Sequence, residues 1–255
     1  MRFAKGSIEV NSGQDMQLLR QVVHSKFVTH DQLFEFMRLG AYENNHNSFN
    51  WRVRRLVEHD FLERHYVAEI SKNSVYRIGD RSTCFSEFAT LLPMKSRKRV
   101  VDPSTCTHSI DLNEIHLSLA RELGLLKTWV SETEIVSKNV LTTSGYAKDY
   151  DAVVTVNNFG GGTSTFALEY ERTPKRKSAY REIRERLQTE TDVDCFLYLA
   201  ATSNLLSFLI HCFADVPCRL YLGLSEQFLA SPMDMPVLDA INSKVIRLGD
   251  ALTPQ

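Results

Sequence analysis

Residues Phe166–Leu187 (FALEYERTPKRKSAYREIRERL) join an apolar run to an amphipathic helix and carry two glutamates at the junction. Successive side chains of a strand point to opposite faces, so Glu169 and Glu171 are expected on the same face of a sheet. We predict a helix over Ser178–Gln188, because its apolar residues recur three and four positions apart: Tyr180, Ile183 and Leu187. A strand that leads into such a helix indicates a sheet with helices packed against it.

The segments on either side extend the same arrangement, and we predict that residues 107–255 form one domain. Upstream, a predicted helix (Asp111–Leu125) is followed by two strand-like segments (Thr128–Val136 and Tyr150–Val156). Downstream, the predicted elements are a strand at Val193–Ala200, a helix at Asn204–Phe213, a strand at Arg219–Leu224 and a short helical piece near Pro236–Asn242. This order predicts an α/β domain with a mixed sheet.

Three acidic residues of this domain are candidates for a metal site. Asp151 opens the second predicted strand, and it approaches Glu169 on one face if the second and third strands pair. Converging carboxylates suit Mg²⁺ or Mn²⁺, which can activate a water and neutralise the charge on a phosphodiester. The alternative is that Glu169 and Glu171 form ion pairs and bind no metal. The candidate partners in that case are Arg172, Lys175 and Arg181.

The N-terminal third, residues 1–92, has a different pattern of helices followed by a hairpin. Helical spacing predicts helices over Asp15–His24 and His30–Leu39. A third helix, over Ser48–Leu62, turns Phe49, Val53, Leu56 and Val57 towards the core. Its opposite face carries Ser48, Trp51, Arg54 and Arg55, with Arg52 at the flank. Two short strands, at Leu62–Ile70 and Ser74–Ile78, follow around a polar turn that contains Lys72.

Over Asp15–Gly79 this order of elements resembles a winged-helix DNA-binding domain. The resemblance implies that the third helix enters the major groove while the hairpin contacts the backbone beside it. The implied DNA-binding residues are Ser48, Trp51, Arg52, Arg54, Arg55 and Lys72. An aromatic side chain among arginines on an outward face is poorly explained by core packing, which supports DNA contact. The alternative is a winged helix that binds protein or acts as a spacer.

The C-terminal domain is similar to the core of the PD-(D/E)XK nuclease fold, through Asp151 and the motif Glu169-Tyr170-Glu171-Arg172. With a winged helix ahead of it, and with His108 and Asn113 before the strands, the chain resembles the replication-relaxation family of plasmid and mobile-element proteins. The resemblance implies metal binding by Asp151 and Glu169, assisted by Glu114 or Glu132. The implied catalytic set is Asp151, Glu169 and Glu171, with Lys175 or Lys177 as the cation. The family's lysine position is occupied here by Glu171, which departs from the motif.

The composition sets limits on the class of protein. The 255 residues have a formal net charge of −1, and no apolar run approaches the length of a membrane span. The five cysteines form no Cys-x-x-Cys pair, which is typical of reduced thiols in a cytosolic protein. A basic run, KSRKR at residues 95–99, lies in the segment 93–106 that we predict to be a linker.

Together these features predict an α+β protein with an N-terminal winged helix followed by an α/β nuclease-like domain with a mixed sheet. We expect a cytoplasmic DNA-binding protein of a plasmid or mobile element, acting in replication, transfer or transcription regulation. The expected partner is double-stranded DNA, with a mobile-element protein or a second copy of the chain as further candidates and no membrane. The alternative function is a DNA endonuclease that requires Mg²⁺ or Mn²⁺. A metal is expected only if the acidic site is active.

Overall fold

The computed structural model describes residues 8–67, 74–91, 101–158 and 161–253, and within them the chain is an α+β protein with a mixed sheet. The chain forms two compact units, Met1–Asn113 (unit 1) and Glu114–Gln255 (unit 2). The division falls inside helix α5 (Pro103–Arg121), later than the predicted start of the second domain at residue 107. Residues 92–100, which include most of the predicted linker and its basic run, lie outside the described residues.

The first half of α5 belongs to unit 1 because two side-chain amides attach it there. Asn113 Nδ2 donates to the carbonyl oxygen of Phe27 over 2.8 Å, and Gln32 Nε2 donates to that of Ile110 over 2.9 Å. Residues 103–106, which we predicted as linker, are therefore helical. Pro103 suits this position, since the first turn of a helix leaves its N–H groups unpaired.

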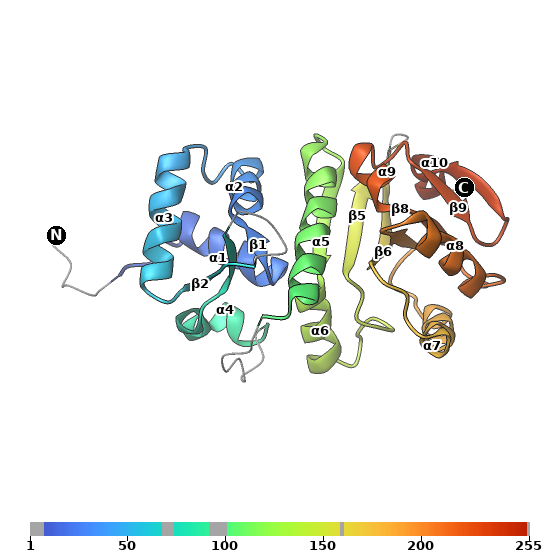
Figure 1. Ribbon diagram of the computed structural model, residues 1–255, viewed down its shortest axis with the longest axis horizontal. Helices are drawn as coiled ribbons and strands as arrows, with labels where there is room; N and C mark the ends of the chain where they lie inside the picture. Colours follow the sequence, from blue (N-terminus) through green and yellow to red (C-terminus); the bar gives the residue numbers. More distant parts are fainter. Residues whose placement is uncertain (1–7, 68–73, 92–100, 159–160, 254–255) are drawn as a thin grey trace. The chain divides into compact units, whose positions relative to one another are not determined.

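Unit 1 contains helices and a small antiparallel sheet in the order α1, β1, α2, α3, β2, β3 (Figure 1). Their bounds are α1 Gln14–Ser25, β1 Val28–Thr29, α2 His30–Leu39, α3 His46–Glu58, β2 Leu62–His65 and β3 Val75–Ile78. Among the described residues the sheet has three strands in the spatial order β1-β3-β2. A 3₁₀ turn (Asp80–Cys84) and a short helix, α4 (Ser86–Ala89), follow β3.

Local capping sets where the helices of unit 1 begin. Thr29 and Gln32 form a reciprocal capping box at the start of α2. Asn45 caps α3, since its Oδ1 accepts the backbone N–H groups of Asn47 and Ser48. Helix α3 therefore starts two residues earlier than its apolar pattern predicted, and it ends four residues sooner.

Unit 2 is built on a sheet with the spatial order β10-β9-β8-β7-β6-β5-β4 in the part of the chain the structure describes. The strands are β4 Leu126–Ser131, β5 Ala152–Asn157, β6 Thr163–Glu171, β7 Cys195–Ala200, β8 Leu220–Leu224, β9 Pro236–Asp239 and β10 Lys244–Arg247. Strands β6, β7 and β8 run parallel, and the remaining neighbours are antiparallel. The predicted mixed sheet is thus confirmed.

The helices of unit 2 are α6 Glu132–Leu141, α7 Lys177–Leu187, α8 Ser203–Cys212, α9 Ser225–Ala230 and α10 Leu248–Leu252. Two predictions were wrong. The strand predicted over Thr128–Val136 ends at Ser131, because Ser131 and Glu134 form a capping box that starts α6. The helical piece predicted near Pro236–Asn242 is the β9–β10 hairpin, whose Asp239 accepts the N–H groups of the turn.

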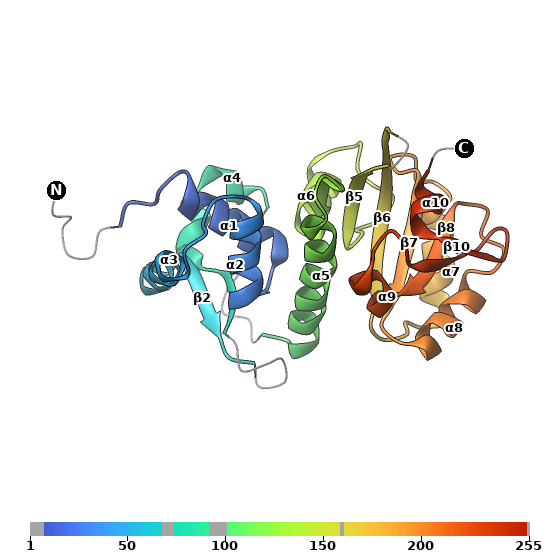
Figure 2. The same ribbon diagram turned by 90° about the horizontal axis from the view of Figure 1, so that it is seen from above.

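Helices α7 and α8 cover one face of this sheet, opposite the C-terminal part of α5 (Figures 1 and 2). Tyr180 and Ile183 of α7 pack in one buried cluster with Ala167 of β6 and Tyr198 of β7. Because side chains alternate along a strand, Glu169 and Glu171 belong to the same face as Ala167. The two glutamates therefore lie on the side of the sheet that α7 and α8 cover.

The five cysteines form no disulfide bond. None of the helices that the structure describes has both the length and the apolar character needed to cross a bilayer.

Candidate functional site

The outer face of α3 is a strip of exposed side chains. Its members, spaced three and four residues apart, are Asn47, Asn50, Trp51, Arg54 and Glu58. Trp51 is 58% exposed, which is unusual for an indole and agrees with the predicted outward orientation. Arg54 pairs with Glu58 at 2.7 Å, but both side chains are exposed. Such a pair contributes only about 0.3–0.5 kcal/mol, so Arg54 can exchange it for another anion.

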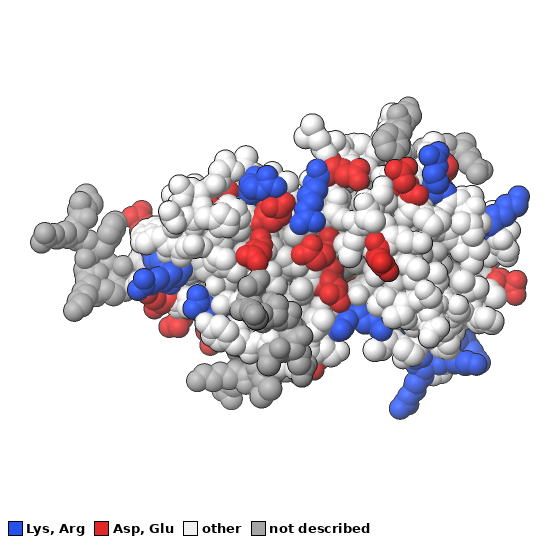
Figure 3. All heavy atoms as spheres, turned by 45° about the horizontal axis from the view of Figure 1, so that its top comes forward, with Lys and Arg blue, Asp and Glu red and all other residues white. Residues whose placement is uncertain are grey.

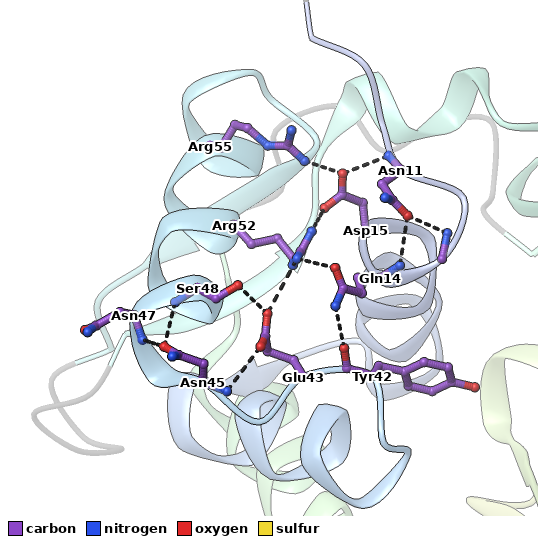
Figure 4. A network of polar contacts seen from close by, with 11 residues as sticks. Asn11, Gln14, Asp15, Tyr42, Glu43, Asn45, Asn47, Ser48, Arg52 and Arg55 are labelled. Atoms are coloured by element: carbon purple, nitrogen blue, oxygen red, sulfur yellow. Dashed lines mark hydrogen bonds and ion pairs between the residues drawn. The ribbon is translucent and has the colours of Figure 1, made fainter.

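Arg52 does not share this orientation, and the prediction that it faces solvent was wrong. It is 6% exposed, and its guanidinium points from α3 towards α1 and the α2–α3 loop (Figure 4). There it donates to Asp15 Oδ1 over 2.6 Å and to Gln14 Oε1 over 2.6 Å. Glu43 Oε2 lies 3.5 Å from the same guanidinium. Arg52 therefore balances buried carboxylates within unit 1.

Arg55 and Ser48 are half-buried, and both contact carboxylates of unit 1. Arg55 forms an ion pair with Asp15, and its guanidinium carbon lies 4.8 Å from the centre of the Trp51 ring. Ser48 Oγ donates to Glu43 over 2.6 Å. These two residues hold α3 in place, and Arg55 supports the indole from one side.

Glu43 shows how strongly this network stabilises a buried charge. Burial by itself favours the neutral acid, but hydrogen bonds from Ser48, from the Asn45 N–H and from Arg52 outweigh it, so the pKa of Glu43 is lowered.

Among the predicted DNA-binding residues, Trp51 and Arg54 are the two exposed ones in the described part of the chain. Lys72 lies outside the described residues.

The second candidate site is in unit 2, where the three predicted carboxylates converge at one end of the β5–β6 pair. The antiparallel register matches Ala152 with Leu168, which sets Asp151 opposite Glu169 as predicted. Asp151 Oδ2 accepts the backbone N–H of Tyr170 over 2.7 Å. Glu169 and Glu171 are each 3% exposed. The site is therefore a buried, carboxylate-rich cluster at one end of two interior strands.

Lysine side chains neutralise both glutamates. Lys148 forms an ion pair with Glu169, and Lys175 forms one with Glu171. Lys175 was predicted both as a catalytic cation and as an ion-pair partner, and it occupies the second role here. Lys177, the other predicted cation, is exposed on α7, and no ion pair joins it to a carboxylate among the described residues.

Sequence reasoning missed Lys148. It precedes Asp151 by three residues, in a loop where no periodicity indicates which way a side chain points. Its position next to Tyr150, whose ring centre lies 5.0 Å from Lys148 Nζ, depends on the tertiary fold. The only sequence signal is a cation close to the aspartate that begins the strand.

The electrostatics of this cluster follow from burial. Burial raises the pKa of Glu169 to about 7, opposed by Lys148 and reinforced by the negative charge of Asp151. Burial lowers the pKa of Lys175, but the charges of Glu171, Glu169 and Asp151 outweigh this effect and raise it. Lys175 is therefore held as an ammonium ion beside the glutamates.

Two buried tyrosines line the same region. Tyr198 of β7 is matched with Glu169 of β6 in the parallel register. Burial and the neighbouring carboxylates raise the pKa of Tyr198, and its hydroxyl has no hydrogen-bond partner among the described residues. Tyr150 differs, because its hydroxyl donates to Glu190 over 3.1 Å. Burial and that carboxylate raise the pKa of Tyr150 as well.

As arranged, these carboxylates do not fit a divalent metal ion. Within the described ranges, no group of three or more histidine, cysteine, aspartate or glutamate side chains is placed to hold one. Ammonium groups already compensate Glu169 and Glu171. Of the two predicted helpers, Glu114 pairs with Arg121 at 3.7 Å. Glu132 begins α6, and its backbone N–H donates to the Asp151 carbonyl over 3.2 Å.

A basic surface extends from this site along α7. Its exposed members are Arg176, Lys177, Arg181 and Arg186, and none forms an ion pair with a described residue. Figure 3 shows lysine and arginine side chains gathered at this end of unit 2. Most other arginines in the described chain have a carboxylate partner, among them Arg20, Arg38, Arg77 and Arg247. Uncompensated positive charge favours a polyanionic ligand.

Comparisons with protein-family models, with curated proteins and with solved structures give no match. Function is therefore inferred from the geometry of these two sites.

Proposed function

We propose that this chain is a DNA-binding protein whose unit 1 contacts duplex DNA through α3. The order of elements in unit 1, with the sheet order β1-β3-β2, matches a winged helix, in which the third helix enters the major groove. The observation that most directly supports this proposal is the exposed strip of α3, where Trp51 and Arg54 project away from the core. The buried network around Arg52 supports this role, because it holds the helix rigidly behind that strip.

Unit 2 acts in this proposal as a second DNA-binding surface, through the basic side chains of α7. The strand order of β4 to β7 and the position of Asp151 and Glu169 favour a nuclease-like scaffold. The paired lysines favour binding over cleavage. By resemblance to the replication-relaxation family, we propose a role in plasmid or mobile-element replication, transfer or transcription regulation in the cytoplasm. A mobile-element protein or a second copy of the chain would be a further partner.

Retardation of a random-sequence duplex at several salt concentrations tests the role of α3. Arg54→Ala should weaken binding and reduce the slope of log affinity against log salt by about one unit, since one phosphate contact is lost. Trp51→Ala should weaken binding with little change in this slope, because the indole carries no charge. Arg38→Ala is the matched control: Arg38 pairs with Glu35 at 2.8 Å on the surface of α2, much as Arg54 pairs with Glu58.

Unchanged affinity and slope for Arg54→Ala would exclude α3 as the DNA-contacting helix. Absence of any retardation of wild type at low salt would favour a protein-binding module. The second surface is tested separately by Lys177→Glu with Arg181→Glu, which should weaken binding in a full chain whose α3 is intact. Equal affinity of this variant and wild type would remove α7 from the proposal.

The alternative function, a DNA endonuclease that requires Mg²⁺ or Mn²⁺, is favoured by one observation. Asp151 and Glu169 meet at the end of paired strands, where nucleases of the resembled fold carry their acidic residues. Nicking of a supercoiled plasmid with Mg²⁺ or Mn²⁺ tests it directly, with Glu169→Ala as the comparison. Metal-dependent nicking that this variant abolishes would establish the enzyme, whereas no nicking by wild type would leave the binding function.

A further inference from the structure

A chain of hydrogen bonds links the hairpin of unit 1 to the outer face of α3. Arg64 Nη2 of β2 lies 3.5 Å from the hydroxyl of Tyr76 on β3. That hydroxyl lies 3.2 Å from Nδ1 of His30, the first residue of α2. The other ring nitrogen of His30, Nε2, lies 2.8 Å from Oδ1 of Asn50 on α3. Four elements of unit 1 are thus joined by consecutive polar contacts.

The direction of these bonds follows from what each group can donate. An amide oxygen only accepts, so His30 Nε2 carries a proton and donates to Asn50 Oδ1. In the neutral ring Nδ1 is then an acceptor, so the Tyr76 hydroxyl donates to it while accepting from Arg64. The ring is also held by packing, since its centre lies 4.9 Å from that of Phe49. The amide of Asn50 is consequently fixed with its oxygen towards His30.

The amide nitrogen of Asn50 then points away from His30, on the exposed strip beside Trp51 and Arg54. No residue that the structure describes accepts a hydrogen bond from Asn50 Nδ2. Asn50 itself is exposed. Its oxygen is turned towards His30, so the amide presents its two N–H protons, rather than its oxygen, to a ligand.

We propose that Asn50 determines base specificity by donating to a guanine in the major groove, and that His30 is its positioning residue. Guanine is the base whose major-groove edge presents two acceptors side by side, N7 and O6. Adenine presents an acceptor and a donor, cytosine a donor, and thymine one acceptor beside a methyl group. An asparagine with a free amide instead pairs with adenine through both its oxygen and its nitrogen. This proposal rests on the proposed binding of DNA by α3.

Selection of binding sites from a randomised duplex, with the full chain, tests the proposal. Wild type should enrich guanine at one position by about tenfold or more over the other bases. Asn50→Ala should lose the preference at that position alone. Asn50→Asp, which offers only acceptors, should shift the preference there to cytosine, whose N4 group donates.

Variants of His30 separate positioning from a purely structural role. His30→Ala frees the amide of Asn50 and should allow adenine at the guanine position. His30→Gln restores an N–H donor near the place of Nε2 and should recover the preference for guanine. If His30→Ala only destabilised the fold, it would lower binding to every sequence equally and leave the base preference unchanged. A changed base preference therefore indicates positioning.

Two results would overturn the inference while leaving DNA binding by α3 intact. In the first, wild type binds duplex DNA but selects no base at any position that responds to substitution of Asn50. The other is an unchanged selected sequence in Asn50→Ala. If wild type binds no duplex at low salt, the proposed function itself fails, and the inference falls with it.

Discussion

Two arginines of α3, two residues apart, are predicted to affect stability by very different amounts. Arg52→Ala removes a side chain that is 6% exposed and leaves Asp15, which is fully buried, without its 2.6 Å partner. Removing one member of a buried ion pair costs about 3–5 kcal/mol. We expect about 3 kcal/mol, the lower end of that range, because Asp15 keeps Arg55 and also accepts the Asn11 N–H over 2.8 Å. Arg54→Ala removes an exposed pair and should cost less than about 0.5 kcal/mol.

Urea denaturation followed by tryptophan fluorescence measures this difference in unit 1. The chain has two tryptophans, Trp51 in unit 1 and Trp129 in unit 2. A Trp129→Phe background therefore makes Trp51 the single reporter. With a urea m-value of about 1.5 kcal/mol/M, Arg52→Ala should lower the midpoint by about 2 M and Arg54→Ala by less than about 0.4 M.

The reasoning fails if the free energies of unfolding of the two variants differ by less than about 1 kcal/mol. Such a result would mean that Arg52 is solvated, or that its neighbours rearrange without cost. The retardation assay supplies the converse comparison: Arg54→Ala should weaken DNA binding while its stability stays close to wild type.

Three further predictions concern other sites. Because burial raises the pKa of Glu169 from its ordinary value near 4.5 to about 7, the folded chain holds a proton that the unfolded chain releases between these pH values. Stability should fall as pH rises through this window, and Glu169→Gln should remove that contribution in urea denaturation at pH 4 to 8. Tyr198→Phe removes a buried hydroxyl with no described partner and should be neutral or raise Tm, whereas Tyr150→Phe loses a bond to a carboxylate and should cost about 1.5–3 kcal/mol. Gly79→Ala should destabilise by about 1–3 kcal/mol in thermal denaturation, because a Cβ there would overlap the backbone carbonyl of Asp60; stability equal to wild type would show that this loop yields freely.

Periodicity in the sequence determined several elements and their buried faces. The spacing of Phe49, Val53 and Leu56 identified α3 and its core side. The apolar positions of α7 likewise gave the face that packs on the sheet. These features are local, because a helix repeats every 3.6 residues and a strand every two, whatever lies opposite.

Trp51 and Arg52 mark the limit of that reasoning. Trp51 was predicted on the outer face of α3 and Arg52 at the flank of that face, and they are 58% and 6% exposed. The difference depends on Asp15, which lies 37 residues before Arg52 in the chain. A position at the edge of a helix face is buried only if another element covers it, and periodicity holds no information about that element.

The carboxylate site divides in the same way. The sequence by itself determined that Glu169 and Glu171 share a face and that Asp151 opens the neighbouring strand. Only the tertiary structure decided their chemical state, since the pairing of β5 with β6 and the loop that carries Lys148 bring the charges together. Ion pairs depend on distances between atoms far apart in the chain, and only the packed fold sets those distances.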